Sequence, residues 1–180
     1  QGSMANYGKN TLYLSRDEGV QVFGGGVTSD DVEFDSMTST LLSKNITPTV
    51  QGLNESRFSQ AEAIVWDYKY ILSVPNTTST VNNLQLVYDF RKGVCTLWDL
   101  PANNFCRFRS SGVDYLFFGD PSTGKIYRYT PTTYSDNGSA IDSYYQTKDF
   151  DLKARANDKI FRKFYVTLDK SSDYTVTVTP

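Results

Sequence analysis

The feature that most constrains the fold is a series of short strand-like segments separated by turns. Residues 63–66 and 70–74 read as two strands across a tight turn, and a polar loop then leads to a strand at residues 84–88. A glycine-bearing turn joins that strand to another at residues 94–98. Four strands joined by tight turns predict one antiparallel meander.

The stretches on either side repeat this scheme. After residue 98 we expect four more strands, and residues 10–46 read as a third, less regular unit. The expected strands of the two units lie at residues 105–108, 113–118, 126–129 and 143–150, and at 12–14 and 20–23, with a strand or a short helical turn at 41–46. The 13 Tyr, 11 Phe and 2 Trp residues also favour pleated structure.

Four-stranded units that recur every 40–45 residues or so are typical of β-propellers. Three such units are too few to close a ring, because propellers have roughly four to eight blades. We therefore predict an all-β chain that forms a partial β-propeller, or a propeller-like stack of four-stranded antiparallel meanders. An open sandwich is the alternative arrangement of the same strands.

Composition excludes several classes of function. The net charge of −2 leaves no basic footprint for nucleic acid, so we expect no specific nucleic-acid partner. No apolar run is long enough to span a membrane, and no basic-then-apolar leader opens the chain, so we expect neither membrane insertion nor secretion by a signal peptide. The chain has no histidine, which removes the commonest general base and metal ligand. We nominate no catalytic, cofactor-binding or metal-ligating residue.

The two cysteines, Cys95 and Cys106, each lie within a strand-like run. Without a paired C-x-x-C motif they do not form a zinc site. Two buried, reduced thiols are the expected state, since free cysteine packs like a small apolar residue. A disulfide is the alternative if strand pairing brings them opposite each other.

Residues Gly119–Lys125, GDPSTGK, match G-x-x-x-x-G-K, one residue short of the phosphate-binding loop of nucleotide hydrolases. A functional loop of this kind is followed by a helix and by a Ser or Thr ligand for magnesium. Here Ile126 occupies the ligand position, and β-branched and aromatic residues predict a strand. We therefore predict a hairpin turn, initiated by Asp120 and Pro121, with Gly124 at a positive φ.

Other motifs also read as turn chemistry. Residues 15–19, SRDEG, are similar to the Asp-box hairpin of sialidase-type propellers, which is a structural turn and not a catalytic site. Several aspartates lie in predicted turns, where the side chain commonly bonds its own backbone: Asp30, Asp31, Asp89, Asp99 and Asp120. A glycoside hydrolase would need a pair of carboxyl groups across a cleft, which the sequence does not reveal.

Aromatic residues are the candidates for ligand stacking. Trp66, Tyr68, Tyr70 and Trp98 could offer a platform for sugars, although packing between strands or blades is the favoured role. Loops 75–83 and 130–143 hold mainly Ser, Thr and Asn, with Tyr134 as their one aromatic. The candidate stacking residues are therefore Tyr134, Trp66 and Trp98.

Several segments, taken in order, carry a resemblance to a known family. They read LLSKNI, AEAIVWDYKYILSV, LQLVYDFRKGVCTLWD, YLFFGDPSTGKIYRY and IDSYYQTKDFDL. This order resembles tail proteins of bacteriophages and prophages that contain β-propeller-like repeats, over about residues 10–152. The resemblance implies a non-enzymatic virion component of the tail hub or nozzle type. A carbohydrate-binding module for host-receptor recognition is the alternative function.

The resemblance also implies partners, location and domain limits. Partners would be other tail proteins and, in the full-length protein, further copies of the same chain, with a host glycan as an additional candidate. The protein would be made in the bacterial cytoplasm and act in the virion. Residues 1–4 read as a tag remnant and start methionine, 5–154 as the propeller-like domain of about three meanders, and 155–180 as a hairpin that opens or joins a second β-region.

Overall fold

The computed structural model describes residues 2–24, 38–133, 135–145, 163 and 165. Its contacts divide the chain into two units, Gln1–Thr133 and Tyr134–Pro180. The expected domain limit at residue 154 and the expected hairpin at 155–180 fall on residues that, apart from 163 and 165, lie outside the described part. Within that part, no helix is long and apolar enough to cross a membrane.

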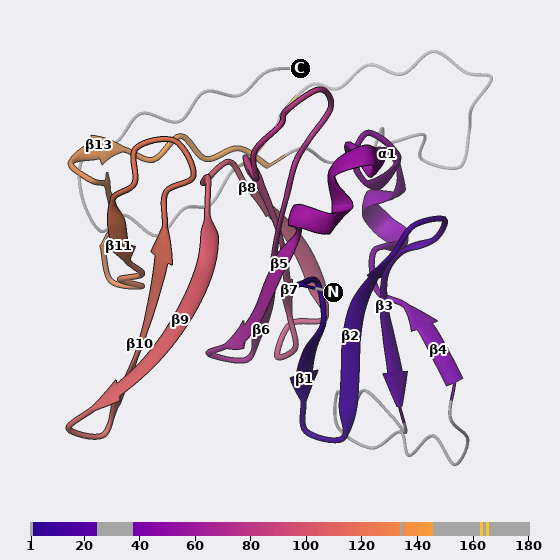
Figure 1. The fold of residues 1–180 in the computed structure, drawn as a ribbon, viewed down its shortest axis with the longest axis horizontal. Helices are drawn as coiled ribbons and strands as arrows, with labels where there is room; N and C mark the ends of the chain where they lie inside the picture. Colours follow the sequence, from indigo (N-terminus) through magenta and orange to yellow (C-terminus); the bar gives the residue numbers. More distant parts are fainter. Residues whose placement is uncertain (1, 25–37, 134, 146–162, 164, 166–180) are drawn as a thin grey trace. The chain divides into compact units, whose positions relative to one another are not determined.

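The first unit is built from three antiparallel sheets in chain order, which appear side by side in Figure 1. All-β character is therefore confirmed. The first sheet contains β1 (Ala5–Tyr7), β2 (Asn10–Ser15), β3 (Gly19–Gly24) and β4 (Thr38–Leu41). The second contains β5 (Glu62–Trp66), β6 (Lys69–Val74), β7 (Leu84–Asp89) and β8 (Val94–Trp98). The third contains β9 (Asn103–Ser110), β10 (Val113–Gly119) and β11 (Ile126–Arg128).

In each sheet the strands follow one another in sequence order, as a meander does. The two four-stranded meanders match the expected units, with β1 as an additional strand that the pattern did not indicate. Between the first and second sheets lie three short helical segments: η1 (Lys44–Ile46), α1 (Thr47–Gln51) and η2 (Glu55–Gln60). The segment expected as a strand or helical turn is thus the end of β4 followed by η1.

The third meander has three strands within the described residues. The expected fourth strand at 143–150 is not seen at residues 143–145, which are irregular, and residues 146–150 lie outside the described part. In the second unit a short hairpin forms instead, from β12 (Ser135–Asp136) and β13 (Ser139–Ala140). Its turn holds Asn137 and Gly138, both at positive φ, as an Asn-Gly hairpin requires.

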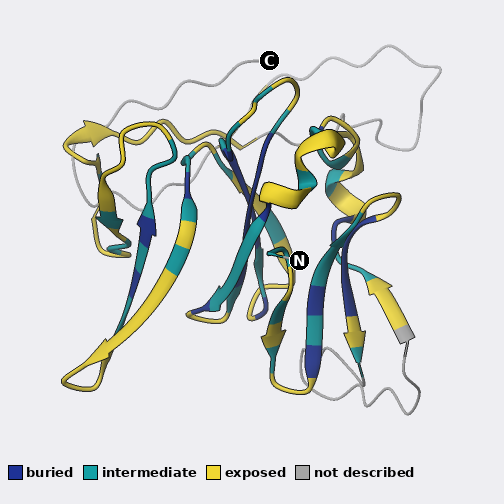
Figure 2. Ribbon diagram, in the orientation of Figure 1, coloured by how far each residue is buried: buried dark blue, intermediate teal, exposed yellow. Residues whose placement is uncertain are grey.

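The second sheet is the middle layer of the first unit, which explains why β6 and β7 are almost continuously buried (Figure 2). Side chains alternate between the two faces of a strand. Tyr70 and Leu72 pack in one cluster with Leu12 and Val22 of the first sheet. Ile71 packs in a second cluster with Leu116 of the third sheet.

Two polar residues buried on the strands of this middle layer, Ser73 and Gln85, are satisfied by hydrogen bonds. The Ser73 hydroxyl donates to the carbonyl of Ala102 at 2.7 Å. The Gln85 side-chain amide donates to the carbonyl of Leu100 at 2.9 Å, and its oxygen accepts a bond from the Tyr129 hydroxyl at 3.2 Å. These bonds attach the second sheet to the segments around the third, because a buried polar group without a partner is costly.

The first strands of the three sheets are neighbours. β1 contacts β5, and β5 contacts β9. At the amino terminus the carbonyl of Gly2 accepts a bond from the Ala63 amide at 2.7 Å, and the Ser3 carbonyl accepts one from the Tyr70 hydroxyl at 2.6 Å. Residues 2 and 3, read as a tag remnant in the sequence, thus contribute hydrogen bonds between the first and second sheets.

Candidate functional site

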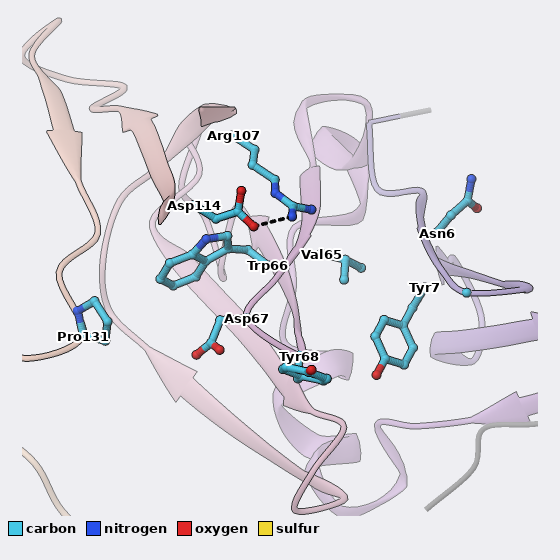
Figure 3. A pocket seen from close by; sticks show the side chains of 10 residues that line it. Asn6, Tyr7, Val65, Trp66, Asp67, Tyr68, Arg107, Asp114 and Pro131 are labelled. Atoms are coloured by element: carbon cyan, nitrogen blue, oxygen red, sulfur yellow. Dashed lines mark hydrogen bonds and ion pairs between the residues drawn. The ribbon is translucent and has the colours of Figure 1, made fainter. Parts of the chain in front are cut away.

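A hollow of about 640 Å³ lies where the first strands of the three sheets meet (Figure 3). Its walls come from the end of β1, the β5–β6 turn, the facing strands β9 and β10, and one residue that follows β11. The lining residues are Asn6, Tyr7, Gly8, Val65, Trp66, Asp67, Tyr68, Arg107, Asp114 and Pro131. All of them belong to the first unit of the chain.

The β5–β6 turn forms one side of the hollow. Trp66 pairs with Lys69, so Asp67 and Tyr68 form a two-residue hairpin loop, as the sequence predicts for a tight turn. Both residues have positive φ, 45° and 57°, as a type I′ turn requires. Asn-Gly is the usual pair at these positions, so an Asp-Tyr pair is strained.

Ion pairs stabilise this turn. The Asp67 carboxylate lies 2.9 Å from Lys69 Nζ and 2.5 Å from an Arg91 Nη atom. The Arg91 guanidinium also lies 4.2 Å from the centre of the Tyr68 ring, a cation–π contact. Burial raises the pKa of Asp67, but the hydrogen bonds and charges of Lys69 and Arg91 outweigh burial and leave this pKa below its usual value.

Across the hollow, Asp114 on β10 is held by two arginines of β9. Its carboxylate lies 2.6 Å from an Arg107 Nη atom and 3.9 Å from Arg109 Nε. The hydrogen bond from Arg107 lowers the pKa of Asp114; burial opposes this, and the charges of both arginines support it. The oxygen that Arg109 faces, Oδ1, is buried and makes no hydrogen bond within the described part of the chain.

This arrangement limits the chemistry of the hollow. A glycosidase acid needs a raised pKa so that it remains protonated near neutral pH. Asp67 and Asp114 both have lowered pKa values, so each is ionised and neither is suited to donate a proton. Within the described residues, no group of three or more Cys, Asp or Glu side chains is arranged to hold a metal ion.

The aromatic candidates differ in their exposure to solvent in the structure. Trp66 is only 9% exposed, and with Trp98 it packs around Tyr129, at ring-centre distances of 5.9 and 5.4 Å. Tyr70 is buried in the core. Tyr68 is 54% exposed and is therefore the one member of this set that is mainly presented to solvent. Tyr134 lies outside the described residues.

The turn predictions at Asp89 and Asp120 are confirmed, whereas Asp99 lies in an irregular segment and not in a turn, and Asp30 and Asp31 lie outside the described residues. In the GDPSTGK loop the Asp120 carboxylate accepts bonds from the amides of Ser122 and Thr123 at 2.7 and 2.9 Å, and Gly124 has a φ of +67°. The loop joins β10 to β11, so it is a hairpin, as predicted. In the turn between β7 and β8, the Asp89 carboxylate likewise accepts hydrogen bonds from the backbone amides of Arg91 and Lys92.

Both cysteines are free thiols, so the alternative of a disulfide is wrong. Cys95 is half-buried, and burial raises its pKa to about 11. Cys106 is exposed, which corrects the expectation that both are buried. The reason is that Cys106 lies on β9, an edge strand whose side chains are mostly exposed.

Comparisons with known proteins give no family assignment. Searches against protein-family models, curated proteins and solved structures find no significant match to this chain.

Proposed function

We propose that this chain is a structural component of a bacteriophage or prophage tail that acts through protein–protein interfaces. The order of turn motifs that resembles such tail proteins is one basis for this function. The arrangement of the three sheets is consistent with it. Successive meanders whose first strands are neighbours, with the middle meander covered on both faces, are what consecutive propeller blades would present.

The observation that carries the proposal is the open edge of the third sheet. The first two sheets have four strands, whereas the third ends at β11 within the described residues. On β11 the side chain of Ile126 is 77% exposed. An unpaired strand edge that presents a large apolar side chain is a site for pairing with another chain. A further copy of this chain or another tail protein would cover that edge.

Light scattering on a size-exclusion column tests this proposal. We expect a discrete oligomer several times the 20.3 kDa protomer. Ile126→Lys should reduce the mass toward one protomer, because a charge on an edge strand opposes pairing. Thr123→Lys, in the exposed turn beside β11, adds the same charge and should leave the oligomer intact. A protomer mass at every concentration, or an oligomer unchanged by Ile126→Lys, would contradict assembly through this edge.

A further inference from the structure

The three sheets of the first unit repeat one local arrangement. Each begins with a two-residue hairpin, which joins β1 to β2, β5 to β6 and β9 to β10. Residues paired across two strands project from the same face of the sheet, and faces alternate along each strand. Counted from its hairpin, the third pair of each sheet therefore lies on an equivalent face. These pairs are Ala5–Leu12, Ile64–Ile71 and Phe108–Tyr115.

In the first two sheets, the face that carries this pair is covered by the sheet that follows. Leu12 is fully buried in a cluster that includes Leu72 of the second sheet. Ile71 is fully buried in a cluster that includes Leu116 of the third sheet. The partners of Leu12 and Ile71 on β1 and β5 pack against the same clusters. One kind of contact thus joins each sheet to the next.

In the third sheet the equivalent face is apolar but largely exposed. Phe108 is 56% exposed, and Figure 2 shows that most of β9 is exposed. Within the described part of the first unit, no further sheet follows to cover this side. We call it the outer face of the third sheet; by strand register it includes Cys106, Phe108, Tyr115, Phe117, Ile126 and Arg128. A contiguous exposed apolar patch of this kind marks an interaction surface.

The first sheet presents the complementary face at the other end of the unit. Leu72 and Leu116 occupy the same position after the hairpins of their sheets, and each packs on the preceding sheet. In the first sheet this position holds Tyr13, which projects away from the second sheet. Phe23 lies on the same face and is 42% exposed. This outer face of the first sheet has no preceding sheet among the described residues.

We propose that the outer face of the third sheet docks onto the outer face of the first sheet in a second copy of this chain. The contact between copies would continue the contact that joins successive sheets within one copy. Charge permits it: Arg128 lies over the Tyr115 ring at 5.5 Å, and the described strand residues on the outer face of the first sheet are uncharged. Because two different surfaces meet, the assembly is a closed ring or a filament.

This inference rests on the proposed function, since both require assembly, but it names a sheet face and a partner in place of the β11 edge. The two can be separated by position. Phe108 lies on β9, at the opposite side of the third sheet from β11. Phe23 lies on the first sheet, so a change there leaves the β11 edge intact.

The test uses light scattering on Phe108→Lys and Phe23→Lys, separately and mixed. Each variant alone should weaken assembly by at least about tenfold, because a charge buried in an apolar contact is costly. An equal mixture retains one unaltered pair of faces, so we expect a dimer of twice the 20.3 kDa protomer. Recovery on mixing also shows that both variants are folded. Val94→Lys is the matched control, since Val94 is 44% exposed on β8, and its oligomer should equal that of the unaltered protein.

Cys106 supplies a second measurement, because its exposed thiol lies on the outer face of the third sheet. In the dissociated protomer it should react quickly with a thiol reagent, and assembly should slow this reaction about tenfold in the unaltered protein but not in Phe108→Lys. The inference would be overturned if either lysine variant stays assembled, if the mixture gives no dimer, or if assembly leaves the Cys106 rate unchanged. If Ile126→Lys dissociates the oligomer while Phe108→Lys does not, the β11 edge remains the interface and this inference alone fails.

Discussion

Replacing Leu116 with alanine tests whether the second and third sheets form one packed body. Leu116 lies on β10 and is fully buried. It packs against Trp66, Ile71 and Val87 of the second sheet. Most other side chains of the third sheet are at least partly exposed, so Leu116 is a principal apolar contact between these two layers.

The expected loss follows from the atoms removed. Leucine to alanine deletes about three methylene equivalents, or roughly 2.4 kcal/mol at about 0.8 kcal/mol each. The cavity left among rigid neighbours adds to this, so we expect a loss of about 3 kcal/mol in the free energy of unfolding. For a chain of this size such a loss lowers the melting temperature by about 6–12 °C.

Urea unfolding followed by tryptophan fluorescence is the assay, since Trp66 contacts the substituted residue. Val113→Ala is the control: it lies on the same strand, is half exposed, and should change stability by less than about 0.5 kcal/mol. A loss below about 1 kcal/mol for Leu116→Ala, with an unchanged urea dependence, would refute the packing of the third sheet on the second.

Two further predictions concern the β10–β11 turn and the thiols. Gly124→Ala should destabilise the protein by about 1 kcal/mol because alanine is strained at a φ of +67°, whereas Ser122→Ala in the same exposed turn should be neutral; equal melting temperatures would contradict this. With a thiol reagent near pH 8, Cys106 should react fast and Cys95 slowly, since burial raises the Cys95 pKa to about 11 and leaves it mostly protonated. The Cys95 rate should rise as the pH approaches that value, and two equally fast thiols at pH 8 would contradict the burial.

Local signals predicted most of the strands and turns of the first unit. The hairpins around Asp67 and Gly124 follow from residues a few positions apart, because turn chemistry and side-chain alternation are local. The β12–β13 hairpin was missed, although its Asn137-Gly138 pair is a strong turn signal, because its flanking residues are polar and show no alternation. The prediction that Cys106 is buried was wrong, because the residue pattern of a strand does not reveal that the strand lies at the edge of a sheet.

The hollow could not be predicted, because its walls come from residues as distant as Asn6 and Pro131. Tyr68 could be named as a candidate aromatic from the sequence. The sequence could not show that Tyr68 is exposed while Tyr70 is buried. That difference depends on which face of β6 packs against the first sheet. The ion pair between Arg91 and Asp67 likewise depends on the β6–β7 register, which brings Lys69 opposite Asp89.

The shared core of the first two sheets has a consequence for the order of events during synthesis. Leu12, Val20 and Val22 of the first sheet are covered in part by β6 and β7, which the ribosome makes some fifty residues or more later. Until those strands emerge, the first meander presents its apolar face to solvent. We therefore expect the nascent amino-terminal half to be a client of chaperones, and a chain that stops before β6 to aggregate.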